Sequence, residues 1–215
     1  GGTLGNYHLG VVRTLLSADM LPTILSGSSA GALIAGIIGT SAHDRLDAIL
    51  DDDARELSSD GHSGAREFYA SPFSQARLKD MIDRLLPDCT FAEAYDRSGC
   101  FINIVVAESA SDGGGRVLNA TVSPDVLLRE AVLASCAVPG VYPPVVLHER
   151  QGNHPPRPYA DGARWMDGSI HADLPAVWLR DQCGVTHLIG SIVNPLELPL
   201  LTDPDKHGSF AHEAA

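Results

Sequence analysis

Residues 22–39 read PTILSGSSAGALIAGIIG, and this stretch decides the fold that the sequence predicts. A short apolar run ends at Ser26, five small residues follow at 27–31, and a second apolar run continues to residue 39. The first run predicts a buried strand, and the second predicts a helix that is apolar on nearly all sides and therefore central. The small residues lie where the strand turns sharply into the helix, because larger side chains would clash there.

The small residues also form the pattern Gly27-x-Ser29-x-Gly31. In a strand–turn–helix unit this pattern holds one side chain out at the end of the strand, here that of Ser29. The positive dipole end of the following helix favours an anion beside that side chain. Acyl transfer needs a projecting nucleophile next to donors for a tetrahedral oxyanion. Such a pattern arises by chance in about one chain in ten, so its placement is what makes it informative.

Two other elements bear on this site. A turn of small residues can also serve close packing or hold a phosphate, but no lysine follows it as in a Walker loop, which makes phosphate the weaker interpretation. The opening GGTLG at 1–5 is a second glycine-rich element. If it followed a strand and preceded a helix, its backbone N–H groups would point at the same oxyanion.

The composition indicates an ordinary globular protein, with 215 residues, 44% hydrophobic and 20% charged. The net charge of −12 argues against nucleic acid as a partner. No cluster of basic residues would draw the chain to anionic lipid, so any membrane contact would have to be apolar. The four cysteines are widely spaced, which argues against a metal site and favours a reducing, intracellular compartment. No apolar stretch approaches the roughly 18 residues of a membrane-spanning helix.

The alternation of predicted elements indicates one α/β domain over residues 1–215, with a mainly parallel central sheet and helices on both faces. Strands are predicted at 21–26, 100–109, 116–122 and 186–193, and the proline-punctuated stretch 138–147 is predicted as loop and strand. Helices are predicted at 6–20, 29–40, 73–86, 91–96, 125–137 and 174–183. Residues 43–68 predict a surface helix running into a loop, and residues 148–165 predict an irregular excursion.

The base that would activate Ser29 has two candidate classes. An Asp–His pair downstream would make a triad, and the candidates are Asp161, Asp167, His171, His187, His207 and His212. A lone histidine is more often a surface or core residue than a base, and the last two lie in the C-terminal tail. Asp167 precedes Gly168 in WMDGSI, at a junction of ordered elements, and can take the proton of a serine directly.

Ordered blocks of the sequence resemble the patatin-like acyl hydrolases, and within them the branch that contains fungal triacylglycerol lipases and bacterial relatives. The matching blocks are GGTLGNYHLGVV (1–12), LPTILSGSSAGALIAGII (21–38), TFAEAYDRSGCFINI (90–104), VLLREAVLASCAVPGVYPPVVL (126–147), MDGSIHADLPAVWL (166–179) and GSIVNPLELPL (190–200). The likeness covers nearly the whole chain, and the order of the blocks makes it specific.

The resemblance implies a three-layer α/β fold and a Ser–Asp dyad without a catalytic histidine. Ser29 matches the nucleophile, and Asp167, followed by Gly168, matches the base in an Asp-Gly-Ser variant of the family block. The oxyanion would be held by backbone amides, and the residues that match are Gly1, Gly2 and Ala30, with Gly5 closing the glycine-rich loop. The resemblance also implies that the loop's first glycine and the strand before it precede this sequence.

The expected function is therefore a serine acyl hydrolase that cleaves fatty-acyl esters of lipids, a triacylglycerol lipase or phospholipase, with no metal or organic cofactor. We expect it in the cytoplasm or peripherally on a membrane or lipid droplet. Two alternatives stay open: a non-catalytic module that binds a lipid surface, and an acyltransferase in which a lysolipid hydroxyl replaces water.

Overall fold

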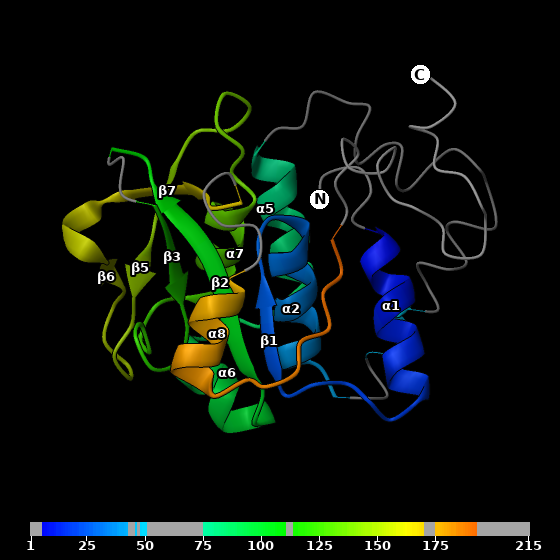
Figure 1. Ribbon diagram of the computed structural model, residues 1–215. Helices are drawn as coiled ribbons and strands as arrows, with labels where there is room; N and C mark the ends of the chain where they lie inside the picture. Colours follow the sequence, from blue (N-terminus) through cyan, green and yellow to red (C-terminus); the bar gives the residue numbers. More distant parts are fainter. Residues whose placement is uncertain are drawn as a thin grey trace, which may run out of the picture.

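The computed structural model describes residues 6–42, 46, 48–50, 75–110, 114–169 and 175–192 (Figure 1). The helices are α1 (Asn6–Ser17), α2 (Ala30–Thr40), α5 (Gln75–Leu85), α6 (Phe91–Ser98), α7 (Leu128–Ser135) and α8 (Ala176–Cys183). The strands are β1 (Ile24–Gly27), β2 (Phe101–Glu108), β3 (Gly115–Leu118), β4 (Val145–Val146), β5 (His148–Glu149), β6 (Arg157–Pro158) and β7 (Arg164–Asp167). Most of these elements lie where the sequence predicts them.

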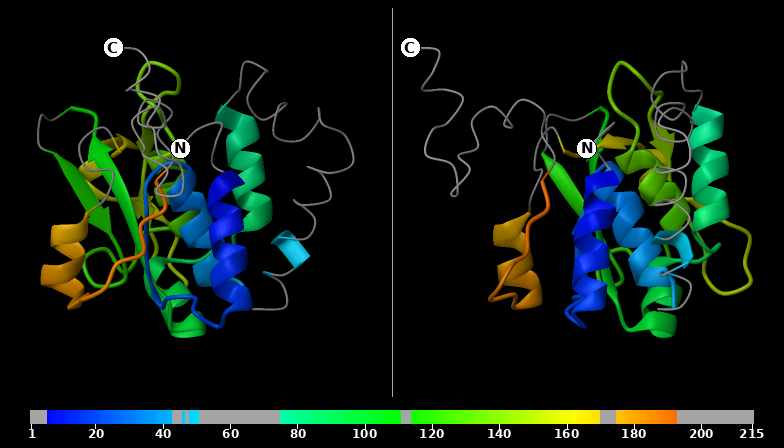
Figure 2. Two further views of the ribbon diagram at one scale, coloured as in Figure 1. Left: turned by 45° about the vertical axis from the view of Figure 1, so that its right-hand side comes forward. Right: turned by 90° about the vertical axis from the view of Figure 1, so that its right-hand side faces the viewer.

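The elements form three layers. The helix α8 lies on one side of the sheet, and α2 and α7 lie on the other (Figures 1 and 2). The apolar helix α2 contacts β1, β2, α6 and α7, and its residues Ala32, Ala35 and Ile37 are buried. The α/β fold class that the sequence predicts is therefore confirmed.

The strand β2 lies at the centre of the sheet, and its β-branched run is buried on both faces. Ile104, Val105 and Val106 are all inaccessible or nearly so. It pairs in parallel with β1 and antiparallel with β3 and β7, and β4 pairs antiparallel with β7. Within the described residues only one pair of strands is parallel, so the sheet is mixed where mainly parallel pairing was expected. The short connection from β2 to β3 forces an antiparallel pair, because a parallel neighbour needs a long crossover.

The ends of β1 and β7 meet on one edge of β2. The strand β3 pairs with residues 104–107 of β2. Ile104 also pairs with Gly27, the last residue of β1, and Val106 also pairs with Asp167, the last residue of β7. Because a residue pairs with one strand on each edge, β1 and β7 both lie on the edge opposite β3. Their final residues are therefore two positions apart along β2, about 7 Å at the usual rise of a strand.

Two further expectations differ from the structure. The strand expected at 186–193 is absent as far as the described residues reach, to 192, and Leu188, Ile189 and Ile192 are exposed. None of the described strands pairs with this segment, so it lacks the ladder that defines a strand. The excursion expected to be irregular contains the β5–β6 pair and leads into β7. Apart from 46 and 48–50, the helix and loop expected at 43–68 lie outside the described residues.

Candidate active site

The turn between β1 and α2 holds Ser29 in an unusual backbone conformation. Ser29 is the N-cap of α2, with φ 53° and ψ −124°, which a residue with a side chain rarely adopts. A Cβ placed on Gly27 would lie 2.1 Å from the carbonyl oxygen of Gly31, so only glycine fits at 27. A Cβ on Gly31 would meet nothing within 4 Å, so crowding does not explain that second glycine.

The first turn of α2 provides a backbone donor beside Ser29. The N–H of Gly31 donates to the carbonyl of Ser28 at 2.9 Å, and that of Ala32 donates to the carbonyl of Ser29 at 3.0 Å. The N–H of Ala30 donates to none of the described residues, as is usual in the first turn of a helix. That turn carries no acidic residue that would offset the helix dipole. Of the expected oxyanion residues, Ala30 begins α2 directly after Ser29, and its role stays a prediction. Gly1 and Gly2, and Gly5 of the same loop, lie outside the described residues.

Asp167 ends β7 as a buried carboxylate, with a relative exposure of 3%. Its N–H donates to the carbonyl of Ala137 at 3.0 Å, and its Oδ1 accepts the N–H of Ser169 at 2.9 Å. Oδ2 accepts no hydrogen bond from the residues that the structure describes. At Gly168 the chain passes so close to β2 that a Cβ would lie 2.9 Å from backbone atoms of Val106. The close approach fixes the direction of the chain directly after the carboxylate.

The shared edge of β2 places the start of the Ser29 turn and Asp167 at nearby positions, and Cys136 interacts with both residues. The Sγ of Cys136 donates to the carbonyl of Ser29 at 3.2 Å. Burial, and secondly the charge of Asp167, raises the pKa of the Cys136 thiol to about 12. The thiol is therefore protonated at neutral pH. Within the described part of the chain, the hydroxyl of Ser29 and the carboxylate of Asp167 form no direct hydrogen bond, so their contact stays a prediction.

Sequence reasoning missed the contribution of Ser135 and Cys136. The hydroxyl of Ser135 accepts the N–H of Ser29 at 3.0 Å, across a separation of 106 residues. Nothing in the local stretch LASCAVPG points to that contact, because it depends on how α7 packs against the sheet. Only the inclusion of this stretch in a block shared with the patatin-like hydrolases singles it out.

The rival candidates lie in different surroundings. Asp161 is exposed in a one-turn 3₁₀ helix (Ala160–Gly162) and has φ 53°. His187 is exposed, and its ring lies 3.0 Å from the hydroxyl of Thr186. His171, His207 and His212 lie outside the described residues.

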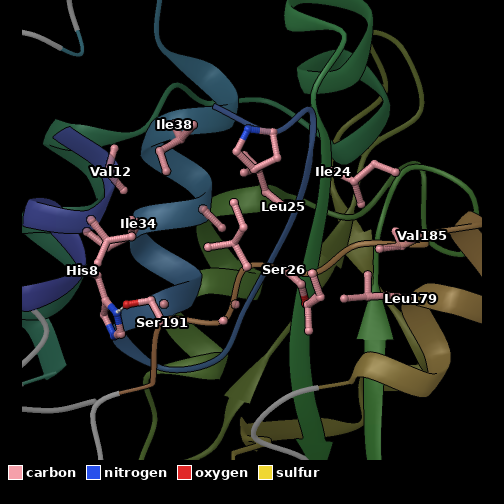
Figure 3. Close-up of a pocket in the computed structure, with 18 of the residues that line it drawn as sticks. His8, Val12, Ile24, Leu25, Ser26, Ile34, Ile38, Leu179, Val185 and Ser191 are labelled. Atoms are coloured by element: carbon pink, nitrogen blue, oxygen red, sulfur yellow. Dashed lines mark hydrogen bonds between the residues drawn. The ribbon is translucent and has the colours of Figure 1, made fainter. Parts of the chain in front are cut away.

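A cavity of about 590 Å³ borders the Ser29 turn. Its walls come from α1, β1, α2, α8 and residues 184–192 (Figure 3). Every residue from 21 to 29 lines the cavity. Successive side chains of a strand point to opposite faces of the sheet, so a cavity over one face would meet only every second residue. The cavity therefore runs along the edge of β1. Apolar side chains such as Val12, Ile34 and Leu179 predominate, and His8 meets Ser191 at 2.7 Å across one side.

Neither metal ligation nor membrane crossing is indicated by the described residues. Among them, no group of three or more His, Cys, Asp and Glu side chains is arranged to hold a metal ion. None of the described helices has the length and apolar character that crossing a bilayer requires.

Comparison with known proteins places this geometry in a family. The model of the patatin-like phospholipase family matches residues 1–177, which include the Ser29 turn and Asp167. The chain belongs to the patatin-like phospholipase family. The resemblance drawn from the sequence blocks is therefore confirmed.

Fungal members of the family are similar to the chain. It is 34% identical to triacylglycerol lipase 4 of Saccharomyces cerevisiae over 94% of its own length and 24% of the yeast protein. It is 34% identical to triacylglycerol lipase ptl2 of Schizosaccharomyces pombe, over 91% of the chain and 32% of that protein. A patatin-like phospholipase domain-containing protein of Neurospora crassa is 36% identical, over 91% of the chain and 23% of that protein. The chain thus spans about a quarter to a third of the length of these relatives.

Proposed function

We propose that the protein is a serine hydrolase of lipid esters in which Ser29 is the nucleophile and Asp167 is the base. The observation that carries the proposal is the meeting of β1 and β7 on one edge of β2, which leaves Gly27 and Asp167 two positions apart. A strained turn presents Ser29 on one side of that gap, and a buried carboxylate lies on the other. Membership of the family and the names of the fungal relatives support the ester-hydrolase chemistry.

In the first step, the Oγ of Ser29 attacks the carbonyl carbon of the ester while its proton passes to the carboxylate of Asp167. The carbonyl oxygen becomes an oxyanion, which the N–H of Ala30 and the amides of Gly1 and Gly2 would stabilise. The tetrahedral intermediate then expels the alcohol, which takes the proton from Asp167. An acyl ester of Ser29 remains.

In the second step, a water molecule gives its proton to Asp167 and attacks the acyl carbonyl. The same amides stabilise the second oxyanion. Ser29 leaves as the alcohol and recovers its proton from Asp167, so the fatty acid is released and the enzyme is regenerated. No metal or organic cofactor takes part in this scheme.

The substrate class we propose is a long-chain acyl ester such as a triacylglycerol or phospholipid. The apolar lining of the cavity beside Ser29 suits the acyl part of such an ester. Peripheral contact with a lipid surface is also part of the proposal. The turn at 138–142 directly follows the residues that contact Ser29 and Asp167, and it exposes Val138 and, at 65%, Val141. An exposed apolar turn beside the site is suited to enter the interface of a lipid droplet or membrane.

Hydrolysis of a panel of lipid esters by the full-length protein tests the proposal. Ser29→Ala is expected to lower turnover at least a thousandfold with the fold intact, because the nucleophile is lost and no buried partner is left unpaired. Ser28→Ala is the matched control, and it should keep substantial activity. A Ser29→Ala protein with more than about a thousandth of wild-type turnover would contradict a covalent mechanism.

Two further readouts separate the alternatives. A fluorophosphonate labels only an activated serine, so a wild-type protein that is not labelled at Ser29 would be a binding module instead. Addition of a lysolipid separates hydrolysis from acyl transfer, since transfer to its hydroxyl would form a diacyl product in place of free fatty acid.

Val141→Asp should lower activity on an emulsified triacylglycerol while leaving activity on a soluble ester unchanged, if the turn contacts the lipid surface.

A further inference from the structure

The edge of β2 has a gap between the end of β1 and the end of β7. The pairing of β1 reaches Ile104, and the pairing of β7 stops at Val106, so Val105 lies between the two strand ends on this edge. The carbonyl of Val105 accepts the hydroxyl of Ser135 at 2.7 Å. Both residues are buried. A buried carbonyl needs a partner, and here the helix α7 supplies one through the side chain of Ser135.

The same hydroxyl also holds the nucleophile turn. The N–H of Ser29 donates to the Oγ of Ser135 at 3.0 Å. Ser29 has a backbone conformation that persists only where the surroundings hold it. Ser135 therefore connects the strained turn to the middle of β2, at the position between the two strand ends.

The next two residues make the corresponding contacts on either side of the gap. The thiol of Cys136 donates to the carbonyl of Ser29 at 3.2 Å, so both backbone groups of Ser29 are held from this segment. The carbonyl of Ala137 accepts the N–H of Asp167 at 3.0 Å. Of these three successive residues, the first two thus contact Ser29 and the third contacts Asp167.

The helix that carries this segment is itself firmly held. Most residues of α7 that precede the segment are buried, among them Ala131, Val132 and Ala134. The guanidinium of Arg129 donates to the carbonyl of Leu86 at 2.8 Å. A group that sets a catalytic geometry to within a fraction of an ångström must be fixed by its own packing, and α7 meets this requirement.

We infer that residues 135–137 position the catalytic pair, with Ser135 and Cys136 as the positioning residues. The inference rests on the proposed function, in which Ser29 and Asp167 react. Neither Ser135 nor Cys136 touches the substrate. They hold Ser29 at the distance and angle from Asp167 that proton transfer requires.

The test compares Ser135→Ala with Ser123→Ala in the full-length protein, using p-nitrophenyl butyrate as the substrate. Ser123 is a matched control, because it is also buried and also accepts a backbone N–H, at 3.0 Å, and donates to a backbone carbonyl, at 3.2 Å, both of Asn119. Both variants should lower the unfolding midpoint. Only Ser135→Ala should lower kcat, by roughly tenfold to a hundredfold with little change in KM, because small displacements of a reacting group have effects of this size. Ser135→Thr keeps the hydroxyl and should restore most of the kcat.

A wild-type kcat in folded Ser135→Ala, or an equal fall in Ser123→Ala, would overturn the inference. If Ser135→Ala does not fold, Cys136→Ala and Cys136→Ser decide, because serine keeps a donor to the carbonyl of Ser29 and alanine does not. A lower kcat in Cys136→Ala than in Cys136→Ser would support the inference, and equal values would overturn it.

Fluorophosphonate labelling separates this inference from the proposed function. A wild-type protein that is not labelled at Ser29 contradicts the proposed function and the inference with it. If the wild type is labelled, and Ser135→Ala is labelled at the same rate, only the positioning role fails. Slower labelling of Ser135→Ala than of Ser123→Ala supports both.

Discussion

Two of the Asp-Gly pairs of the chain, at 161–162 and 167–168, lie six residues apart and occupy different surroundings. Asp161 and Gly162 lie in an exposed turn, where their φ angles are 53° and 78°. Asp167 and Gly168 end β7, where the aspartate is buried and a Cβ on the glycine would meet the backbone of Val106 at 2.9 Å. Gly162 allows a left-handed turn, whereas Gly168 allows the chain to pass close to the backbone of β2, a contact called the close crossing below.

The difference teaches that local turn chemistry does not identify a catalytic aspartate. What distinguishes Asp167 is its partner on the neighbouring strand, since pairing with Val106 brings it to the gap where β1 ends. Asp161 has no such neighbour in the sheet, since the strand pairing of β7 starts only at Arg164. The first three predictions below change one member of this comparison and leave the other as the control, and the last tests the histidines.

The largest expected effect is on turnover. Asp167→Asn should lower kcat on a lipid ester about a thousandfold, because the amide cannot take the proton of Ser29. Asp161→Asn should stay within about twofold of wild type, since an exposed turn residue takes no part in the reaction. Steady-state kinetics of the two variants, with circular dichroism to verify folding, measure the difference. Equal activities would remove the distinction between the two aspartates.

The next effect is on stability. Gly168→Ala should lower the free energy of unfolding by about 3 kcal/mol or more, because backbone atoms of β2 cannot move away from the added Cβ. Gly162→Ala should cost only about 1 kcal/mol, since nothing is closer than 4.0 Å and only the positive φ is unfavourable. Urea denaturation of both variants checks the order. A Gly162→Ala protein less stable than Gly168→Ala would contradict the close crossing.

A smaller effect is expected on the thiol beside Asp167. The pKa of Cys136 is raised to about 12, by burial first and by the charge of Asp167 second, so its thiolate is scarce and iodoacetamide should modify it slowly at pH 8. Asp167→Asn removes the negative charge and lowers that pKa, so alkylation should become faster, though burial keeps it slow. Asp161→Asn should leave the rate unchanged. Peptide mass spectrometry of timed reactions measures both rates, and an unchanged rate in Asp167→Asn would place the carboxylate elsewhere.

The smallest effect is expected at the histidines. His187→Ala should stay within roughly tenfold of wild-type turnover, the range of a packing disturbance rather than of lost acid–base chemistry. His171→Ala should behave in the same way. A folded variant of either residue without activity would replace the Ser29–Asp167 pair by a triad.

The sequence predicts the parts of the site that depend on local pattern. The Gly27–Gly31 turn, the central helix α2 and the buried strand β2 follow from apolar runs and small residues, and the structure has them at the predicted places. The strand β7 was not predicted, because its four residues follow a proline-rich stretch and alternate too briefly to show a period. Its antiparallel direction and its place on β2 depend on contacts between residues far apart in the sequence.

The contacts of Ser135 could not be predicted for the same reason. Serine at the end of an apolar helix has no pattern of its own, and its two partners, Ser29 and Val105, are 106 and 30 residues away. The preference for Asp167 over Asp161 did follow from the sequence, since the stretch that carries Asp167 precedes the helix expected at 174–183. The reason for that preference, the gap on the edge of β2, is visible only in the fold.

A crystal structure of the full-length protein would test the Ser29–Asp167 pair without relying on activity. The distance to measure joins the hydroxyl oxygen of Ser29 to the nearer carboxylate oxygen of Asp167. We predict about 2.6–3.2 Å, or slightly more without substrate, with Asp161 well beyond hydrogen-bond reach. A hydrogen bond from the Ser29 hydroxyl to Asp161 or to a histidine, with the carboxylate of Asp167 turned away from the gap, would contradict the proposed pair.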